Sequence, residues 1–243
     1  MTEAALVLVC KRPGLGIGKQ RLATSLGLEA ANQVAEALLA CALEDAHAWS
    51  GPVVVAPAHR KDYDWAEALL PEMHFKVRVE PQAEGNLGHR LSTLDGKLRT
   101  AGWEHLVYIG SDAPALDAFD YAAAREALEH HDTVLMPSSD GGVVLMASRK
   151  PWPQLGGLPW STPGLGTALA GCCRAAGQSV AILTQGFDVD EEGDLVRLIT
   201  ALKHDRRPAR RALHGLASRL VQPGSRIDTQ LDAQLEETGH GQF

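Results

Sequence analysis

The chain has 243 residues, a length that fits one domain with at most a short appendage. Asp and Glu outnumber Lys and Arg by 30 to 23, so the formal net charge of -7 provides no broad positive surface for nucleic acid or an anionic membrane. The apolar runs are too short to cross a bilayer, no signal-peptide pattern is present, and the four cysteines lack metal or disulfide spacing. These features predict a reduced, cytoplasmic, globular protein.

Short apolar segments alternate along the chain with longer segments of helical periodicity. This alternation is typical of βα units around a largely parallel sheet. The expected strands are residues 4–10, 52–58, 75–80, 105–109, 133–137, 142–147 and 179–183. The expected amphipathic helices are residues 29–48, 117–130 and 191–202.

The fifth and sixth expected strands are separated by residues 138–141 alone, too few for a parallel crossover. These two strands should therefore pair antiparallel. The predicted fold class is α/β, a three-layer sandwich with a mostly parallel sheet that carries an antiparallel strand. Residues 1–203 form the expected main domain. Residues 204–243 form an expected extension, with an amphipathic stretch up to Val221, then a polar end without a further strand.

The segment that follows the first strand reads KRPGLGIGKQRL. A glycine-rich turn between a strand and a helix offers free backbone N–H groups, and Arg12, Lys19 and Arg21 add charge that suits a diphosphate. Pro13 and Gln20 exclude a Walker A loop, and Lys19 stands where a dinucleotide fingerprint needs glycine. The alternative is a loop with solvated charges. We favour the phosphate site, because open α/β sheets bind ligands at the carboxyl ends of their strands.

Later loops supply carboxylates. Asp112 follows the fourth strand, and carboxylate oxygens suit Mg²⁺ or Mn²⁺, although a lone Asp in such a turn is more often a cap. Asp188 and Asp190 share one side of an extended segment, so both can face one cation. Asp190 fits equally well as the cap of the helix that follows. Asp140 precedes two glycines and fits either a hairpin turn or a close approach to a ligand.

Together these blocks resemble the nucleotide-diphospho-sugar transferase superfamily, which has the glycosyltransferase-A fold, and within it a bacterial branch of arsenosugar-biosynthesis-type glycosyltransferases. Five ordered blocks within residues 6–202 carry the resemblance. The first block matches at Pro13, Gly16, Lys19, Arg21 and Leu22, and the second at Gly85 to Arg90. The third matches at Gly110, Asp112 and Pro114, the fourth at Asp140 to Gly142, and the fifth at Asp188, Asp190, Asp194 and Leu195. The chain departs from the pattern at Gln20, Asn86 and Val143, where the branch has Thr, an acid and Tyr. The usual Asp-x-Asp metal motif is also absent.

The residues and the resemblance together imply a nucleotide or nucleotide-sugar donor, a small-molecule acceptor and a divalent cation, Mg²⁺ or Mn²⁺. The expected nucleotide contacts are Arg12, Pro13, Gly14, Gly16, Gly18, Lys19, Arg21, Gln82, Gly85, Asn86 and Arg90. The expected metal ligands are Asp112, Asp188 and Asp190. The acceptor side is expected to contain Gly141, Gly142, Trp160, Ser161 and Thr162, with Trp160 either stacking on a sugar or simply packing. The candidate catalytic residues are Lys19, Asp112 and Asp140.

Two reactions fit this set of residues. In glycosyl transfer, Asp140 acts as the base on an acceptor hydroxyl. In nucleotidyl transfer, an acceptor phosphate attacks the α-phosphorus of a nucleoside triphosphate, with cations supplying most of the catalysis. A domain that senses nucleotides without turnover is the non-enzymatic alternative. We place glycosyl transfer slightly ahead.

Overall fold

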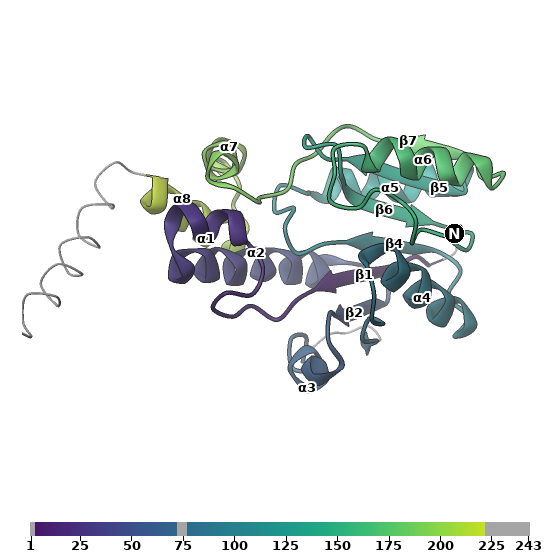
Figure 1. The fold of residues 1–243 in the computed structure, drawn as a ribbon, viewed down its shortest axis with the longest axis horizontal. Helices are drawn as coiled ribbons and strands as arrows, with labels where there is room; N and C mark the ends of the chain where they lie inside the picture. The colour runs from purple at the N-terminus through teal and green to yellow at the C-terminus, as the bar shows by residue number, and fades with distance from the viewer. Residues whose placement is uncertain (1–2, 72–76, 222–243) are drawn as a thin grey trace, which may run out of the picture.

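The computed structural model describes residues 3–71 and 77–221. These residues form one seven-stranded sheet in the order β3-β2-β1-β4-β6-β5-β7 (Figure 1). The strands are β1 (Ala5–Cys10), β2 (Val53–Pro57), β3 (Val77–Val79), β4 (Leu106–Ile109), β5 (Thr133–Pro137), β6 (Val143–Ser148) and β7 (Val180–Ile182). Each expected strand is present, within two residues at each observed end. Residues 75 and 76 of the third expected strand lie outside the described residues.

The strand directions confirm the predicted mixed sheet. β6 runs antiparallel to both of its neighbours, β4 and β5, and every other pairing is parallel. The short turn between β5 and β6 produces this reversal, as the four-residue spacing predicted.

The helices are α1 (Gln20–Leu26), α2 (Leu28–Ala48), α3 (Tyr63–Glu67), α4 (Leu87–Thr100), α5 (Ala118–His130), α6 (Leu165–Ala175), α7 (Glu192–Leu202) and α8 (Pro208–Val221), with a short 3-10 turn, η1 (Arg60–Asp62). The expected helices correspond to α2, α5 and α7, and the amphipathic stretch up to Val221 is α8. The predicted polar end, residues 222–243, lies outside the described residues. None of the described helices combines the length and the apolar character that a bilayer crossing requires.

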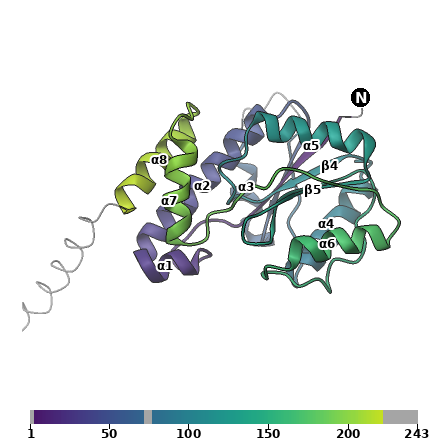
Figure 2. The ribbon, with the colours of Figure 1, turned by 90° about the horizontal axis from the view of Figure 1, so that it is seen from above.

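Helices cover both faces of the sheet, which explains why its strands are continuous apolar runs. In β1, Leu6 and Leu8 face a core built with α2, α3 and α5, while Ala5 and Val7 face a core built with α4 and α6. Figure 2 shows α5 on one side of the sheet, with α4 and α6 on the other. The three-layer architecture is confirmed.

A third apolar cluster lies beside the sheet, where α1, α7 and α8 pack with α2 (Figure 2). Leu22, Val34, Leu195 and Leu213, one residue from each of these helices, are all fully buried in it. Within this assembly the side chain of Arg210, on α8, is also fully buried. α8 is therefore packed into the body of the protein rather than lying free in solvent.

The topology brings distant loops together at one edge of the sheet. β1 and β4 are parallel neighbours, so the segments that follow Cys10 and Ile109 leave from the same edge. β6 is antiparallel, so the turn before Val143 lies at that edge too. The chain returns there after β7, where Val189 N donates a hydrogen bond to Asp112 O over 2.9 Å.

Candidate functional site

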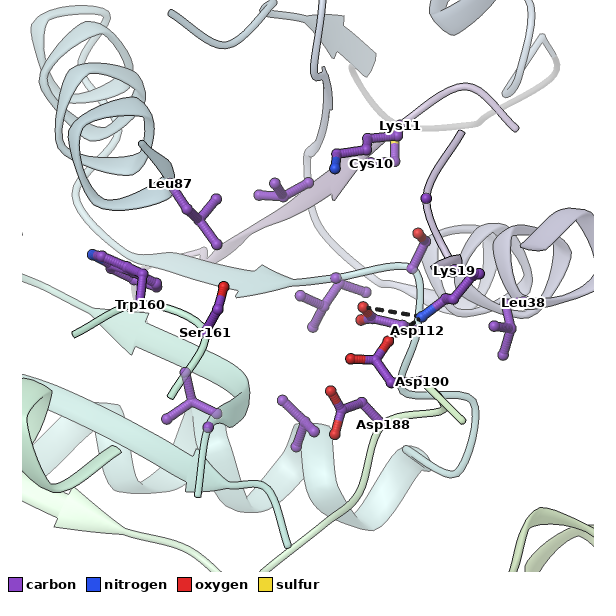
Figure 3. A pocket seen from close by; sticks show the side chains of 18 of the residues that line it. Cys10, Lys11, Lys19, Leu38, Leu87, Asp112, Trp160, Ser161, Asp188 and Asp190 are labelled. Atoms are coloured by element: carbon purple, nitrogen blue, oxygen red, sulfur yellow. Dashed lines mark hydrogen bonds and ion pairs between the residues drawn. The ribbon is translucent and has the colours of Figure 1, made fainter. Parts of the chain in front are cut away.

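A cavity of about 680 Å³ opens at this edge of the sheet. Its walls come from the segment after β1, the N-terminal part of α4, the end of β4, the start of β6, the residues before α6 and the residues before α7. The site therefore draws on segments from nearly the whole described chain. Figure 3 shows charged groups on one side of the cavity and apolar groups on the other.

The segment after β1, residues 11–19, is here called the glycine loop. Ile17 N donates to Gly14 O over 2.9 Å and closes a tight turn. Gly16 and Gly18 have φ angles of 74° and 71°, in the left-handed region that favours glycine. Glycine at positions 16 and 18 therefore suits the backbone of this turn and of the residue that follows it.

Two arginines at the glycine loop are available to a ligand. Arg12 and Arg21 line the cavity, are exposed, and form no ion pair with any residue in the described part of the chain. An exposed guanidinium without a carboxylate partner can bind phosphate oxygens in a bidentate manner.

Lys19 has a different environment, because its ammonium group is directed toward carboxylates. Nζ donates to Val189 O over 2.7 Å and to Asp190 Oδ1 over 2.8 Å, and lies 3.6 Å from Asp112 Oδ2 (Figure 3). Burial by itself would lower the pKa of Lys19, but the carboxylates of Asp112 and Asp190 outweigh it and raise that pKa. The lysine is therefore charged and counters carboxylates in this structure.

Asp112, Asp188 and Asp190 form a cluster, here called the acidic triad. One oxygen from each residue lies within 4.8 Å of the others. Three convergent carboxylate oxygens are the donor set that Mg²⁺ and Mn²⁺ favour, so these residues fit a divalent ion. The alternative role of Asp190 as a helix cap is not observed, because Glu191 caps α7 with Asp194 as its partner.

Asp188 is held in the acidic triad by a serine from another loop. Ser138, directly after β5, donates from Oγ to Asp188 Oδ1 over 2.5 Å. Burial raises the pKa of Asp188, the bond from Ser138 lowers it, and the carboxylates of Asp112 and Asp140 raise it further. Because a cation would relieve this repulsion, the pKa shift agrees with the cluster's suitability for a metal ion.

Gln82 and Arg90 form a polar wall deeper in the cavity. Gln82 is buried, donates from Nε2 to Ala56 O over 2.6 Å, and accepts a hydrogen bond from Arg90. The Nε of Arg90 is buried and has no hydrogen-bond partner. Burial lowers the pKa of Arg90. An unpaired buried donor at the cavity wall is a group that a ligand can satisfy.

The opposite end of the cavity is lined by residues 142–146 together with Trp160, Ser161, Thr162 and Leu165, here called the apolar end. Trp160 donates from Nε1 to Leu155 O over 2.8 Å, which fixes its ring beside Leu87 (Figure 3). Ser161 has a φ of 62°, an uncommon value for a residue other than glycine. Strained residues of this kind cluster at ligand sites.

Asp140 lies in the exposed turn before β6. Its Oδ1 accepts a hydrogen bond from Gly142 N over 2.8 Å, which stabilises the turn. Its second oxygen, Oδ2, has no hydrogen-bond partner among residues 3–71 and 77–221. Asp140 thus forms the expected turn, lines the cavity and keeps one oxygen without a hydrogen bond from the described residues.

Several residues expected at the site do not line the cavity, namely Gly14, Gly16, Gly85, Asn86 and Gly141. Asn86 instead caps α4, accepting from His89 N over 2.9 Å, and donates to Gly156 O over 2.8 Å. The remaining expected residues all line it. Gly14, Gly16, Gly85 and Gly141 lie in the loops that surround the cavity rather than in its lining.

Some lining residues were not among those expected. Leu87 and Tyr108 form part of the wall, and Ser138 positions Asp188. Ser138 directly follows a strand at the carboxyl edge of the sheet. The position of Asp112 after its strand is what identified Asp112 in the sequence, so the same criterion could have identified Ser138. Cys10 also lines the cavity, but burial first and Asp62 second raise its pKa to about 12, so its thiol is not a nucleophile near neutral pH.

Solved structures share this fold. A protein from Desulfovibrio desulfuricans G20, described as a candidate nucleotide-diphospho-sugar transferase, is similar with a TM-score of 0.77 and 24% identity, over 91% of this chain and 97% of that chain. The 4-diphosphocytidyl-2C-methyl-D-erythritol synthase of Anaerococcus prevotii DSM 20548 is similar with a TM-score of 0.51 and 9% identity, over 80% of this chain and 95% of that chain. The expected nucleotide-diphospho-sugar transferase fold is confirmed.

No curated protein sequence matches the chain significantly. One family model does match, over residues 38–162, and it is described as an uncharacterized protein conserved in bacteria, DUF2064. The matched region runs from the middle of α2 to Thr162 at the apolar end of the cavity, and includes Asp112 and Asp140. The chain belongs to the DUF2064 family.

Proposed function

We propose that the protein is a transferase that uses a nucleotide-activated donor, and that it moves a sugar from a nucleotide-diphospho-sugar to a small acceptor. The observation that carries this proposal is the cavity, which brings the glycine loop and the acidic triad together at the carboxyl edge of the sheet. Cations and free N–H groups offset phosphate charge, while carboxylates hold a divalent ion that bridges phosphates. The fold shared with the candidate transferase of Desulfovibrio desulfuricans agrees with this function.

The acidic triad would hold Mg²⁺ or Mn²⁺. When bound, such an ion neutralises the charge that develops on a leaving diphosphate. Arg12 and Arg21 would pair with the phosphate oxygens, since both are exposed and unpaired within the described chain. The buried Arg90 Nε would donate to the nucleotide portion of the donor.

Asp140 is suited to act as the base. Its Oδ2 is free, and the residue lies in the turn that joins the acidic triad to the apolar end. An acceptor hydroxyl bound at the apolar end would pass its proton to Oδ2 as it attacks the anomeric carbon. The bond from Gly142 N to Oδ1 would keep the carboxylate oriented during that transfer.

The distribution of charge in the cavity favours glycosyl transfer over nucleotidyl transfer. The cations that line it come from the glycine loop, from α1 and from α4, and they are Lys11, Arg12, Lys19, Arg21 and Arg90. The apolar end, as described above, contributes no lysine or arginine. A phosphorylated acceptor would find no counter-charge there, whereas a neutral sugar hydroxyl would find Trp160 and Ser161.

Nucleotidyl transfer is the second candidate, and the free arginines favour it. A nucleoside triphosphate carries more negative charge than a nucleotide-sugar. The positive charges of Arg12 and Arg21 together can compensate this additional negative charge.

A ligand panel separates these functions. The full chain would be mixed with Mg²⁺ or Mn²⁺ and with nucleoside triphosphates or nucleotide-diphospho-sugars, and the melting temperature and the released products would be recorded. We expect the largest stabilisation from a nucleotide-diphospho-sugar, with slow release of the nucleoside diphosphate. Preferential stabilisation by a triphosphate would instead indicate nucleotidyl transfer, and stabilisation without any turnover would indicate a sensing domain.

Arg21→Ala should weaken binding of the nucleoside diphosphate that stabilises the protein most by about fivefold to tenfold, while binding of the matching nucleoside changes little. The reason is that an exposed guanidinium contributes a charge-assisted contact to phosphate alone. Isothermal titration calorimetry measures both affinities. Arg174→Ala, which removes an exposed arginine on α6 outside the cavity, is the matched control. Equal weakening of diphosphate and nucleoside would place the phosphates elsewhere.

A further inference from the structure

The ammonium group of Lys19 lies within the acidic triad. It is bonded to Asp190 Oδ1 over 2.8 Å and paired with Asp112 Oδ2 over 3.6 Å. Its side chain is only 13% exposed, so solvent cannot replace these contacts easily. The charge of the three carboxylates is thus partly compensated by a cation that belongs to the chain itself.

A divalent ion would bind to the same residues that Lys19 contacts. Asp112, Asp188 and Asp190 each offer an oxygen within 4.8 Å of the others, and two of these residues already face the Lys19 ammonium. A divalent ion typically contacts its oxygen ligands at about 2.0–2.6 Å, so an ion held by Asp112 and Asp190 would lie close to Nζ. Like charges at that separation repel strongly, and the two cations therefore exclude one another.

The backbone at Lys19 is in an uncommon conformation, and the glycines before it lie in open space. Lys19 has φ 46° and ψ 38°, a strained conformation for a residue with a side chain. It precedes α1 and follows Gly16 and Gly18, around which a Cβ atom would meet nothing within 4 Å. The bonds from Nζ to Asp190 and to Val189 O help to hold this conformation, so losing them would release the end of the glycine loop.

We infer that Lys19 is the resident counter-ion of the acidic triad and is displaced when a divalent cation binds. The displaced ammonium group then becomes available to the phosphates of the donor, which is the step that rests on the proposed function. Lys19 therefore alternates between two anionic partners, the acidic triad and the phosphates. Nucleotide and metal should accordingly strengthen each other's binding.

The first test uses Mn²⁺ alone, titrated into the full chain and followed by calorimetry or by the electron paramagnetic resonance signal of free Mn²⁺. We expect Lys19→Met to bind Mn²⁺ about tenfold more tightly than the wild type, because the competing ammonium is gone. Arg174→Met removes the same charge from an exposed position on α6, outside the cavity, and should change the affinity by less than about threefold, because that charge is screened. Unchanged or weaker binding by Lys19→Met, or an equal gain in both variants, would overturn the inference.

A second measurement needs no variant and so does not depend on how Lys19→Met folds. The wild type is acetylated briefly with an amine-reactive ester, with and without Mg²⁺, and the modification of each lysine is quantified by mass spectrometry. Lys19 should react several-fold faster when Mg²⁺ is present, while Lys61, exposed and outside the cavity, should not change. Slower or equal labelling of Lys19 in Mg²⁺ would show that the ammonium stays in place.

Adding a nucleoside diphosphate to the Mn²⁺ titration then tests the coupling. The diphosphate should tighten Mn²⁺ binding more in the wild type than in Lys19→Met. If the coupling is the same in both proteins, the displaced lysine does not reach the phosphates. If no nucleotide binds either protein, the proposed function fails, while the titrations with Mn²⁺ alone still decide the role of Lys19.

Discussion

Arg210→Ala is expected to destabilise the protein by about 3–5 kcal/mol, because it removes a fully buried cation that pairs with the buried carboxylate of Asp45. The Arg210 side chain is fully buried and donates to Asp45 Oδ2 over 2.6 Å, to Glu44 Oε2 over 3.0 Å and to Pro114 O over 3.1 Å. Among the described residues, Asp45 would keep the side-chain donors Tyr121 and Arg207. Urea denaturation at neutral pH measures the loss as a lower transition midpoint.

The neighbouring Arg211 provides the control. It lies on the same helix but is exposed, so Arg211→Ala should change the free energy of unfolding by no more than about 0.5 kcal/mol. Arg210→Met, which keeps much of the volume but removes the charge, should be nearly as unstable as Arg210→Ala. If Arg210→Ala lowered the free energy of unfolding by less than about 1 kcal/mol, water would be reaching Asp45, and the bonds from Arg210 to Asp45 and Glu44 would contribute little to stability.

Asp112→Asn should weaken Mn²⁺ binding on the order of 100-fold and remove most of the metal-dependent part of nucleotide affinity. The substitution keeps the shape of the side chain but takes one anionic oxygen from the acidic triad, and charged oxygen ligands dominate the affinity for hard divalent ions. The Mn²⁺ titration and a nucleotide titration with and without Mg²⁺ measure the two effects.

Asp140→Asn is the matched control, because Asp140 also lines the cavity but lies outside the acidic triad. It removes the same charge, so the expected loss of Mn²⁺ affinity is no more than about threefold. Similar losses in both variants would mean that the cavity attracts Mn²⁺ through its general charge. An Asp112→Asn variant with wild-type Mn²⁺ affinity would exclude the acidic triad as the metal site.

The strands could be predicted from the sequence because both faces of the sheet are covered. Strands of this kind are continuous apolar runs, such as Val53 to Ala56, and such runs stand out from the helical segments between them. The antiparallel pairing of β5 and β6 followed from the length of their turn. α4 was missed, although Leu91, Leu94 and Leu98 have helical spacing, because two glycines and several polar residues lower its mean hydropathy.

The site was predictable in part, and for a topological reason. Asp112 was placed beside the glycine loop because parallel strands end at the same edge of a sheet, and the structure brings it near Asp188 and Asp190. The contact of Lys19 with Val189 O could not be predicted. It depends on a backbone carbonyl and on the φ of 46° at Lys19, and neither leaves a pattern in residue types.

The pairing of Lys19 with Asp190 has a consequence for how the protein is made. These residues are separated by 171 positions in the chain. At ordinary rates of translation the ribosome takes on the order of ten to thirty seconds to add that many residues. Until Asp190 has been made, the ammonium group of Lys19 lacks the carboxylate that it bonds over 2.8 Å, and Arg210, which anchors the turn after Asp112 at Pro114, is synthesised later still. The candidate site is therefore complete only once nearly all of the described chain has been synthesised, although its glycine loop is among the first segments to be made.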